Sequence, residues 1–199
     1  MTTNRLEAFS DGVLAIIITI MVLELHRPEE PSLHALVDAT GVGFLTYLLS
    51  FIYIGIYWNN HHHLFQLCAE VGGGVLWANL HLLFWLSLYP LTTGWMDEQR
   101  LAEIPTVVYG VNLLGAAIAY YILQLTIIRR PGGARVREAL GTDVKGRLSP
   151  VLYLVGIGIA FLTPWLALIP YVAVALMWLV PDRRVERYLA THPRPEAEL

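Results

Sequence analysis

Residues 5–23 read Arg5-Leu-Glu-Ala-Phe9-Ser10-Asp11-Gly-Val-Leu-Ala-Ile-Ile-Ile-Thr-Ile-Met-Val-Leu23. A hydroxyl and a carboxylate thus stand directly before an apolar run that only Thr19 interrupts. A charged side chain at the centre of a bilayer costs on the order of 3 kcal/mol or more, so Asp11 needs a partner or a function. The stretch therefore predicts a membrane helix that carries a polar group at one end.

The composition of the whole chain agrees with a membrane protein. Of its 199 residues, 56% are hydrophobic and 15% are charged, with a mean hydropathy of +0.54, whereas a soluble domain carries about 25% charged residues. Cys68 is the single cysteine, which excludes an intrachain disulfide and a cysteine-ligated zinc site. The sequence holds no nucleotide-binding, HExxH or GxSxG pattern. We therefore expect no enzyme, no cofactor and no nucleic-acid partner.

Six apolar stretches are candidates for helices across about 30 Å of hydrocarbon, a distance that takes about 20 residues. Their approximate bounds are 9–25, 42–65, 75–94, 105–128, 149–162 and 164–180. The last two are short, and Pro164 either separates them or kinks one long helix. We therefore expect an all-α integral membrane protein in which residues 1–199 form one domain with a basic loop at 129–148.

The basic residues favour six spans over five. With six spans and a cytoplasmic N-terminus, Arg5, the 129–148 loop and the C-terminal tail all face the cytoplasm, which leaves only Arg27 and Arg100 outside. Five spans would divide the basic residues almost evenly between the two sides. Because cytoplasmic loops carry the excess of Lys and Arg, we predict six spans with both termini in the cytoplasm.

On this topology, polar side chains from three helices come to the cytoplasmic side of the membrane. They are Arg5, Ser10 and Asp11 in the first helix, Trp58, His61 and His62 at the end of the second, and Asn79 and His81 in the third. Polar groups at one depth can satisfy one another where water is absent. A set of contacts that fixes helix packing is the favoured interpretation, and a proton relay or gate remains open. A metal site is disfavoured, because consecutive histidines on a helix cannot all face one ion.

A second feature is an aliphatic stripe on the first helix. Ile16, Ile20 and Leu23 follow i, i+4, i+7 spacing, and Thr19 places one hydroxyl on a neighbouring line. Such a stripe packs against protein or lipid, or it forms a hydrophobic constriction of the kind that gates pores by dewetting. The stripe alone does not decide between these.

The pattern Arg5-x-x-x-Phe9-Ser10-Asp11 at the beginning of a first span resembles the signature of the transmembrane protein 175 family. These proteins are endolysosomal and prokaryotic potassium channels. The further matches are Trp58 with His61 and His62, the run Asn79-Leu-His-Leu-Leu-Phe-Trp85, and the closing Leu179-Val-Pro-Asp-Arg-Arg184. A single set of six spans resembles the prokaryotic branch.

This resemblance implies a homotetramer whose first helices line a central pore. It points to Ile16 as the narrowest ring, to Ile20 and Leu23 further along, and to Thr19 as a hydroxyl that contacts the ion. The signature residues Arg5, Phe9, Ser10 and Asp11 would hold the pore helix against its neighbours. We therefore expect a modestly selective, potassium-permeable channel in a bacterial inner membrane. Its partners would be its own copies, the lipid bilayer and the permeant K⁺.

The residues alone do not exclude three other functions. A proton-conducting channel would use Asp11 and the histidines, and its current would follow pH rather than potassium. A histidine-based metal-binding membrane protein would retain zinc or iron on purification. A helical scaffold would carry no current at all.

Overall fold

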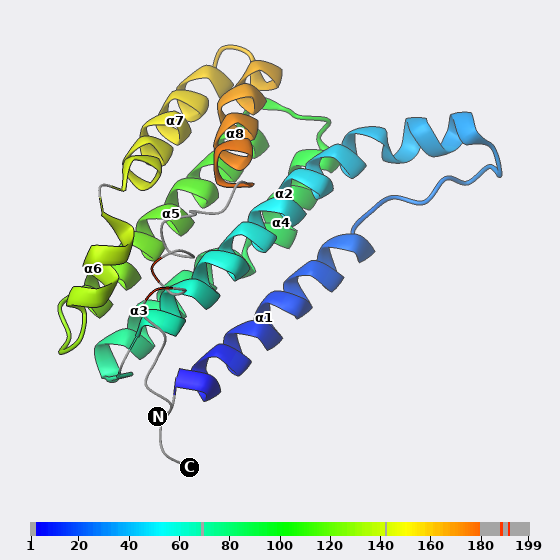
Figure 1. Ribbon diagram of the computed structural model, residues 1–199. Helices are drawn as coiled ribbons and strands as arrows, with labels where there is room; N and C mark the ends of the chain where they lie inside the picture. Colours follow the sequence, from blue (N-terminus) through cyan, green and yellow to red (C-terminus); the bar gives the residue numbers. More distant parts are fainter. Residues whose placement is uncertain (1–2, 69, 142, 180–187, 189–190, 192–199) are drawn as a thin grey trace.

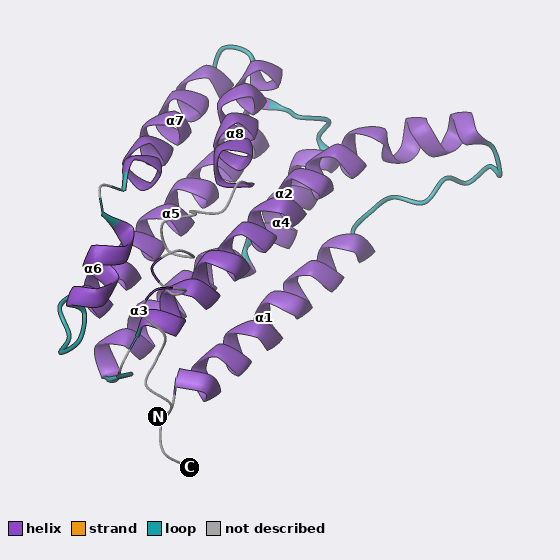
Figure 2. Ribbon diagram, viewed as in Figure 1, coloured by secondary structure: helices purple, strands orange, loops and turns teal. Residues whose placement is uncertain are grey.

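The computed structural model describes residues 3–68, 70–141, 143–179, 188 and 191. Within these ranges the chain is helical, with loops between the helices and no strand (Figures 1 and 2). The helices are α1 (Thr3–Leu23), α2 (Leu33–Leu67), α3 (Gly73–Ser87), α4 (Tyr89–Glu98), α5 (Glu103–Ile128), α6 (Ala134–Leu140), α7 (Val144–Ala160) and α8 (Pro164–Leu179). The expected all-α membrane fold is therefore confirmed.

The helices form a bundle with two distinct ends (Figure 1). The start of α1 and the α2–α3 and α5–α6 connections lie at the lower end in that view. The α1–α2, α4–α5 and α7–α8 connections lie at the upper end. α1 packs against α2, α3 and α4 at one side of the bundle, while α7 and α8 pack against each other and α7 packs against α5 on the opposite side.

Among the described residues, four helical segments are long and apolar enough to cross a membrane. They are α1, α2, the α3–α4 pair (Gly73–Glu98) and α5. α7 and α8 are separate helices of 17 and 16 residues, so Pro164 begins a new helix rather than kinking a long one. At 1.5 Å per residue each is about 25 Å long, which is shorter than the hydrocarbon layer. The six-span topology stays a prediction.

Several helix ends differ from the bounds drawn by hydropathy. α1 begins earlier, at Thr3, and α2 begins earlier, at Leu33, where the Ser32 side chain accepts the backbone N–H of Ala35 at 3.1 Å. The expected basic loop 129–148 contains α6 and the first turn of α7. Hydropathy marks only the apolar middle of a helix, whereas capping residues set where it begins. The tail arginines Arg183, Arg184, Arg187 and Arg194 lie outside the described residues.

Glycines make room for large aromatic rings between closely packed helices, because each ring occupies the space that a side chain would fill. A Cβ on Gly115 of α5 would overlap the indole of Trp85 in α3, and a Cβ on Gly110 or Gly156 would overlap the buried ring of Tyr171. Small residues let membrane helices approach closely in this way. The side of the bundle away from α1 is therefore tightly packed.

Candidate functional site

The first helix has one buried face and one bare face. Its buried face follows helical spacing and consists of Leu6, Ser10, Leu14, Ile17 and Met21. The four pore candidates of the sequence analysis, Ile16, Thr19, Ile20 and Leu23, all lie on the exposed side. Ile16 is 59% exposed and Leu23 is 71% exposed in the single chain. Within the part of the chain that the structure describes, no other segment covers this aliphatic stripe.

Thr19 makes its contact within its own helix. Its Oγ1 lies 3.1 Å from the carbonyl oxygen of Ala15 and 2.9 Å from that of Ile16. A hydroxyl has one hydrogen and two acceptor lone pairs, so Thr19 donates to the helix and keeps acceptor capacity on the bare face. Its oxygen can therefore accept a contact from a cation or from water.

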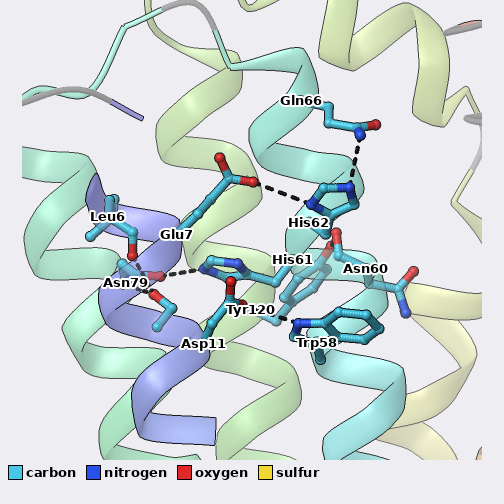
Figure 3. A network of polar contacts seen from close by, with 11 residues as sticks. Leu6, Glu7, Asp11, Trp58, Asn60, His61, His62, Gln66, Asn79 and Tyr120 are labelled. Atoms are coloured by element: carbon cyan, nitrogen blue, oxygen red, sulfur yellow. Dashed lines mark hydrogen bonds and ion pairs between the residues drawn. The ribbon is translucent and has the colours of Figure 1, made fainter. Parts of the chain in front are cut away.

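A directional chain of hydrogen bonds ties α2 and α3 to the buried face of α1 (Figure 3). His61 Nε2 and Asn79 Oδ1 lie 2.7 Å apart, Asn79 Nδ2 donates to Ser10 Oγ at 3.0 Å, and Ser10 Oγ donates to the Leu6 carbonyl at 2.9 Å. Because an amide oxygen only accepts, the geometry requires His61 to carry its proton on Nε2. His61, Asn79 and Ser10 are all buried. The chain can stabilise helix packing, and every member of it has a partner.

A second group of contacts lies beside this chain, at the surface. Trp58 Nε1 donates to Asp11 Oδ1 at 3.1 Å, and both residues are exposed. His62 Nδ1 lies 3.4 Å from Glu7 Oε1, while its Nε2 contacts Gln66 at 2.8 Å (Figure 3). Asp11 is therefore held at the edge of α1, between the bare face and α2, rather than in the interior.

The other predicted residues do not join these contacts. Arg5 and Phe9 are exposed on α1. His81 is exposed as well, and its Nε2 accepts the indole N–H of Trp85 in the same helix at 3.1 Å. Across the described ranges, no group of three His, Cys, Asp or Glu side chains could hold a metal ion. The geometry therefore offers no support for the histidine-based metal site.

Two sets of polar residues were absent from the sequence analysis. Glu7 stands one helical turn before Asp11 and contacts His62 of α2; the i, i+4 spacing places Glu7 and Asp11 on the same side of α1 and could have drawn attention to Glu7. The second set is a polar stripe on α2, made of Thr46, Ser50, Tyr53, Tyr57 and Asn60. Its 3- to 4-residue spacing marks one helical face, and polar residues within membrane helices face the bundle interior.

Comparison with known proteins gives consistent matches. The model of a family described as endosomal/lysosomal potassium channel TMEM175 matches residues 5–90. A protein of Chryseobacterium sp. (strain P1-3), named as a potassium channel, is 53% identical over 190 residues, which cover 95% of this chain and 98% of that protein. The human protein named endosomal/lysosomal proton channel TMEM175 is 40% identical over 76 residues, which cover 33% of this chain and 15% of that protein.

A solved structure matches over nearly the whole fold. It is the crystal structure of a lysosomal potassium-selective channel TMEM175 homolog from Chamaesiphon minutus. The two chains superpose with a TM-score of 0.77 at 30% identity, and the match covers 92% of this chain and 97% of that one. The similarity therefore extends beyond the signature helix to the complete bundle.

Proposed function

Since the chain belongs to the TMEM175 family of channels, we propose that it is a potassium-permeable cation channel whose pore is lined by α1 from several copies. Relatives of nearly equal length are named as potassium channels, which supports transport of this ion. The family is one of channels, so an enzymatic role has no support.

The observation that carries the proposal is the bare aliphatic face of α1. Ile16, Ile20 and Leu23 face away from their own bundle, although the opposite face of the same helix is fully packed. One copy of α1 cannot enclose an aqueous path, whereas cyclic symmetry places several copies around an axis and closes the ring. We propose four copies, with the bare faces turned toward that axis.

Such a pore would have an apolar neck. The Ile16 side chains offer an ion no oxygen, so conduction requires the ring to widen and become wet. Thr19, one turn further along, supplies acceptor oxygens that replace part of the lost hydration. Potassium holds its hydration shell less strongly than sodium, so a partly dehydrating neck favours potassium modestly. Ile20 and Leu23 extend the neck toward the upper end of the bundle.

The proposed setting is a bacterial inner membrane, with residues 1–199 as one domain and both termini cytoplasmic. The lower end of the bundle would then face the cytoplasm and the upper end the outside. The positive-inside rule supports this orientation, because α6, its flanking loops and the first turn of α7 carry six of the nine Lys and Arg residues in the described ranges.

A proton channel is the second candidate, and two observations favour it. The human relative is named as a proton channel. Asp11 is an exposed carboxylate at the edge of the bare face. Glu7 lies one turn before it on α1 and contacts His62 of α2. In this alternative the ion carried past α1 is H⁺, and the current follows pH rather than potassium.

The deciding experiment is a reversal potential measured with purified protein in a planar bilayer, with potassium on one side and sodium on the other. A reversal toward the potassium equilibrium potential supports the potassium channel, and a current that follows only pH supports the proton channel. Ile16→Asn is expected to raise conductance and weaken the preference for potassium. The matched control is Leu154→Asn on α7, because Leu154 is 58% exposed, almost the same as Ile16. Unchanged conductance and selectivity in Ile16→Asn would remove Ile16 from the neck.

A further inference from the structure

A polar seam runs through the interior of the single bundle, on the inner side of α1. It begins with the stripe on α2, where Thr46, Ser50, Tyr53 and Tyr57 are all buried. The face they form is turned into the bundle, whereas the pore candidates on α1 are turned out of it. Hydroxyl groups in the interior of a membrane bundle hold helices together through hydrogen bonds, and together with ionisable residues they can form an ion or proton pathway.

The centre of the seam is a closed ring of five tyrosines, one from each of five helices. The ring centroids of neighbouring members lie 6.0–6.4 Å apart, in the order Tyr53, Tyr89, Tyr109, Tyr171, Tyr153 and back to Tyr53. Every member is at most 2% exposed. Tyrosine hydroxyls both donate and accept hydrogen bonds, so the ring gathers exchangeable protons in the interior of the bundle.

Two polar atoms in this region lack a partner among the described residues. They are the hydroxyl of Tyr89 and Oδ1 of Asn112, and these residues are 0% and 2% exposed. Asn112 uses its Nδ2 to donate to Thr92 Oγ1 at 3.2 Å, so its oxygen remains open. Buried polar groups of this kind are normally satisfied by ordered water. Tyr89 and Thr92 lie on the α4 face that packs against α5, so both open atoms belong to one interface.

The seam continues from the tyrosine ring to the upper end through hydroxyl groups. Tyr109 OH lies 3.0 Å from Ser50 Oγ, which lies 2.7 Å from Thr93 Oγ1. Thr93 in turn lines a small hollow together with Thr46 and Asp97. The Asp97 carboxylate lies 3.3 Å from the exposed His26 ring in the α1–α2 connection. The upper end of the seam is therefore a carboxylate close to water.

The seam also opens toward the lower end. A small crevice, with room for water, is lined by residues of the tyrosine ring and of the α6–α7 connection. Tyr53, Tyr57 and Tyr153 line its deep part, while Asn60 and Asp143 line its lower part. Asp143 accepts the backbone N–H of Gly146 at 2.8 Å and stands at the beginning of α7. A carboxylate therefore stands near each end of the seam.

We propose that this seam conducts protons through the interior of each copy, by a path separate from the pore between copies. Asp97 and Asp143 exchange protons with water at the two ends. Between them, each hydroxyl or bound water accepts a proton on one side and releases one on the other, so no side chain keeps a charge in the apolar interior. The net result is one H⁺ removed from one aqueous side and one H⁺ released on the other. The hydroxyl groups and waters then reorient their O–H bonds to the starting direction before the next proton is transferred. The proposal does not depend on α1 lining a potassium pore.

The test uses the full chain in vesicles loaded with potassium. Valinomycin sets the membrane potential, so the driving force for proton uptake does not depend on the channel itself, and an internal pH dye reports the uptake. Potassium flux is measured in parallel without valinomycin. The variants Tyr89→Phe and Ser50→Ala each remove one hydroxyl from the seam and keep the surrounding packing. Ser87→Ala is the matched control for Ser50→Ala, because Ser87 is exposed and its hydroxyl donates to the Phe84 carbonyl of its own helix at 2.7 Å.

The expected result is that proton uptake in Tyr89→Phe and Ser50→Ala falls to the rate of protein-free vesicles. Potassium flux stays at the wild-type rate, which also shows that the variants are folded and inserted, and Ser87→Ala behaves as wild type. Wild-type uptake no faster than in protein-free vesicles would overturn the proposal. Unchanged uptake in both seam variants, with an altered rate in Ile16→Asn, would overturn it as well and place the protons in the central pore. If the wild-type protein carried no potassium, the potassium channel would lose support. The proton uptake of the wild type and of the two seam variants would still decide whether the seam conducts protons.

Discussion

Replacing Asn79 by Leu tests whether the His61–Asn79–Ser10 chain holds α1 in place. Leucine keeps nearly the same volume and removes both polar atoms. The His61 Nε2–H donor and one acceptor site on Ser10 Oγ then lose their partners, at positions that are 2% and 0% exposed. A hydrogen bond between membrane helices contributes about 0.6 kcal/mol on average and at most about 1.7. The two lost bonds therefore predict a destabilisation of about 1–3 kcal/mol, the range that buried unpaired groups also suggest.

The assay is unfolding of the purified protein in mixed micelles by increasing mole fractions of sodium dodecyl sulfate, followed by circular dichroism. His81→Leu is the control, because His81 lies two positions along the same helix, is exposed and accepts its hydrogen bond from Trp85 within its own helix. The control is expected to change stability by about 0.5 kcal/mol or less.

A double-mutant cycle adds the specific readout. Ser10→Ala and Asn79→Leu together should cost less than the sum of the single variants, since both remove the same Asn79–Ser10 bond. An unfolding free energy for Asn79→Leu that equals the wild-type value, or strict additivity in the cycle, would refute the argument that this chain fixes α1.

Two glycine substitutions are expected to act in opposite directions. Gly115→Ala should destabilise the protein by about 1–3 kcal/mol, because its Cβ would overlap the rigid indole of Trp85; full stability in the same unfolding assay would contradict this. Gly43→Ala should be tolerated, because the atoms nearest to its Cβ belong to the Asp97 carboxylate, the end of a side chain that can rotate away, and alanine is favoured over glycine in a helix by about 1 kcal/mol; a loss of stability would count against it. Gly158→Ala, where the added Cβ meets no atom within 4 Å, is the control for both and should be neutral or stabilising.

The sequence predicted those features that depend on local chemistry. Uninterrupted apolar stretches identify membrane helices, because a backbone in lipid must satisfy its own hydrogen bonds. The signature Arg5-x-x-x-Phe9-Ser10-Asp11 was sufficient to indicate the family, which the comparisons confirm. Periodicity also placed Ile16, Ile20 and Leu23 on one line of the first helix, and the structure leaves that line bare.

The sequence could not show that Ser10 is buried while Asp11, its neighbour in the signature, is exposed. Ser10 is buried in a three-helix chain of hydrogen bonds, whereas Asp11, the next residue, is exposed and contacts Trp58. Successive residues on a helix point about 100° apart, so the direction in which the helix packs decides which of them meets Asn79. The same reason separates buried Asn79 from exposed His81.

The tyrosine ring is the feature that the sequence indicated least, because it is formed only when distant helices pack together. Its members come from α2, α4, α5, α7 and α8, and each one alone resembles an ordinary tyrosine in an apolar helix. The repeating polar spacing on α2 was visible in the sequence, yet the partners of that stripe were not. Hydropathy and spacing therefore determined which segments are apolar helices and which faces of those helices differ. The packing of distant helices decided which polar groups meet, because a contact between residues far apart in the chain leaves no local trace in either segment.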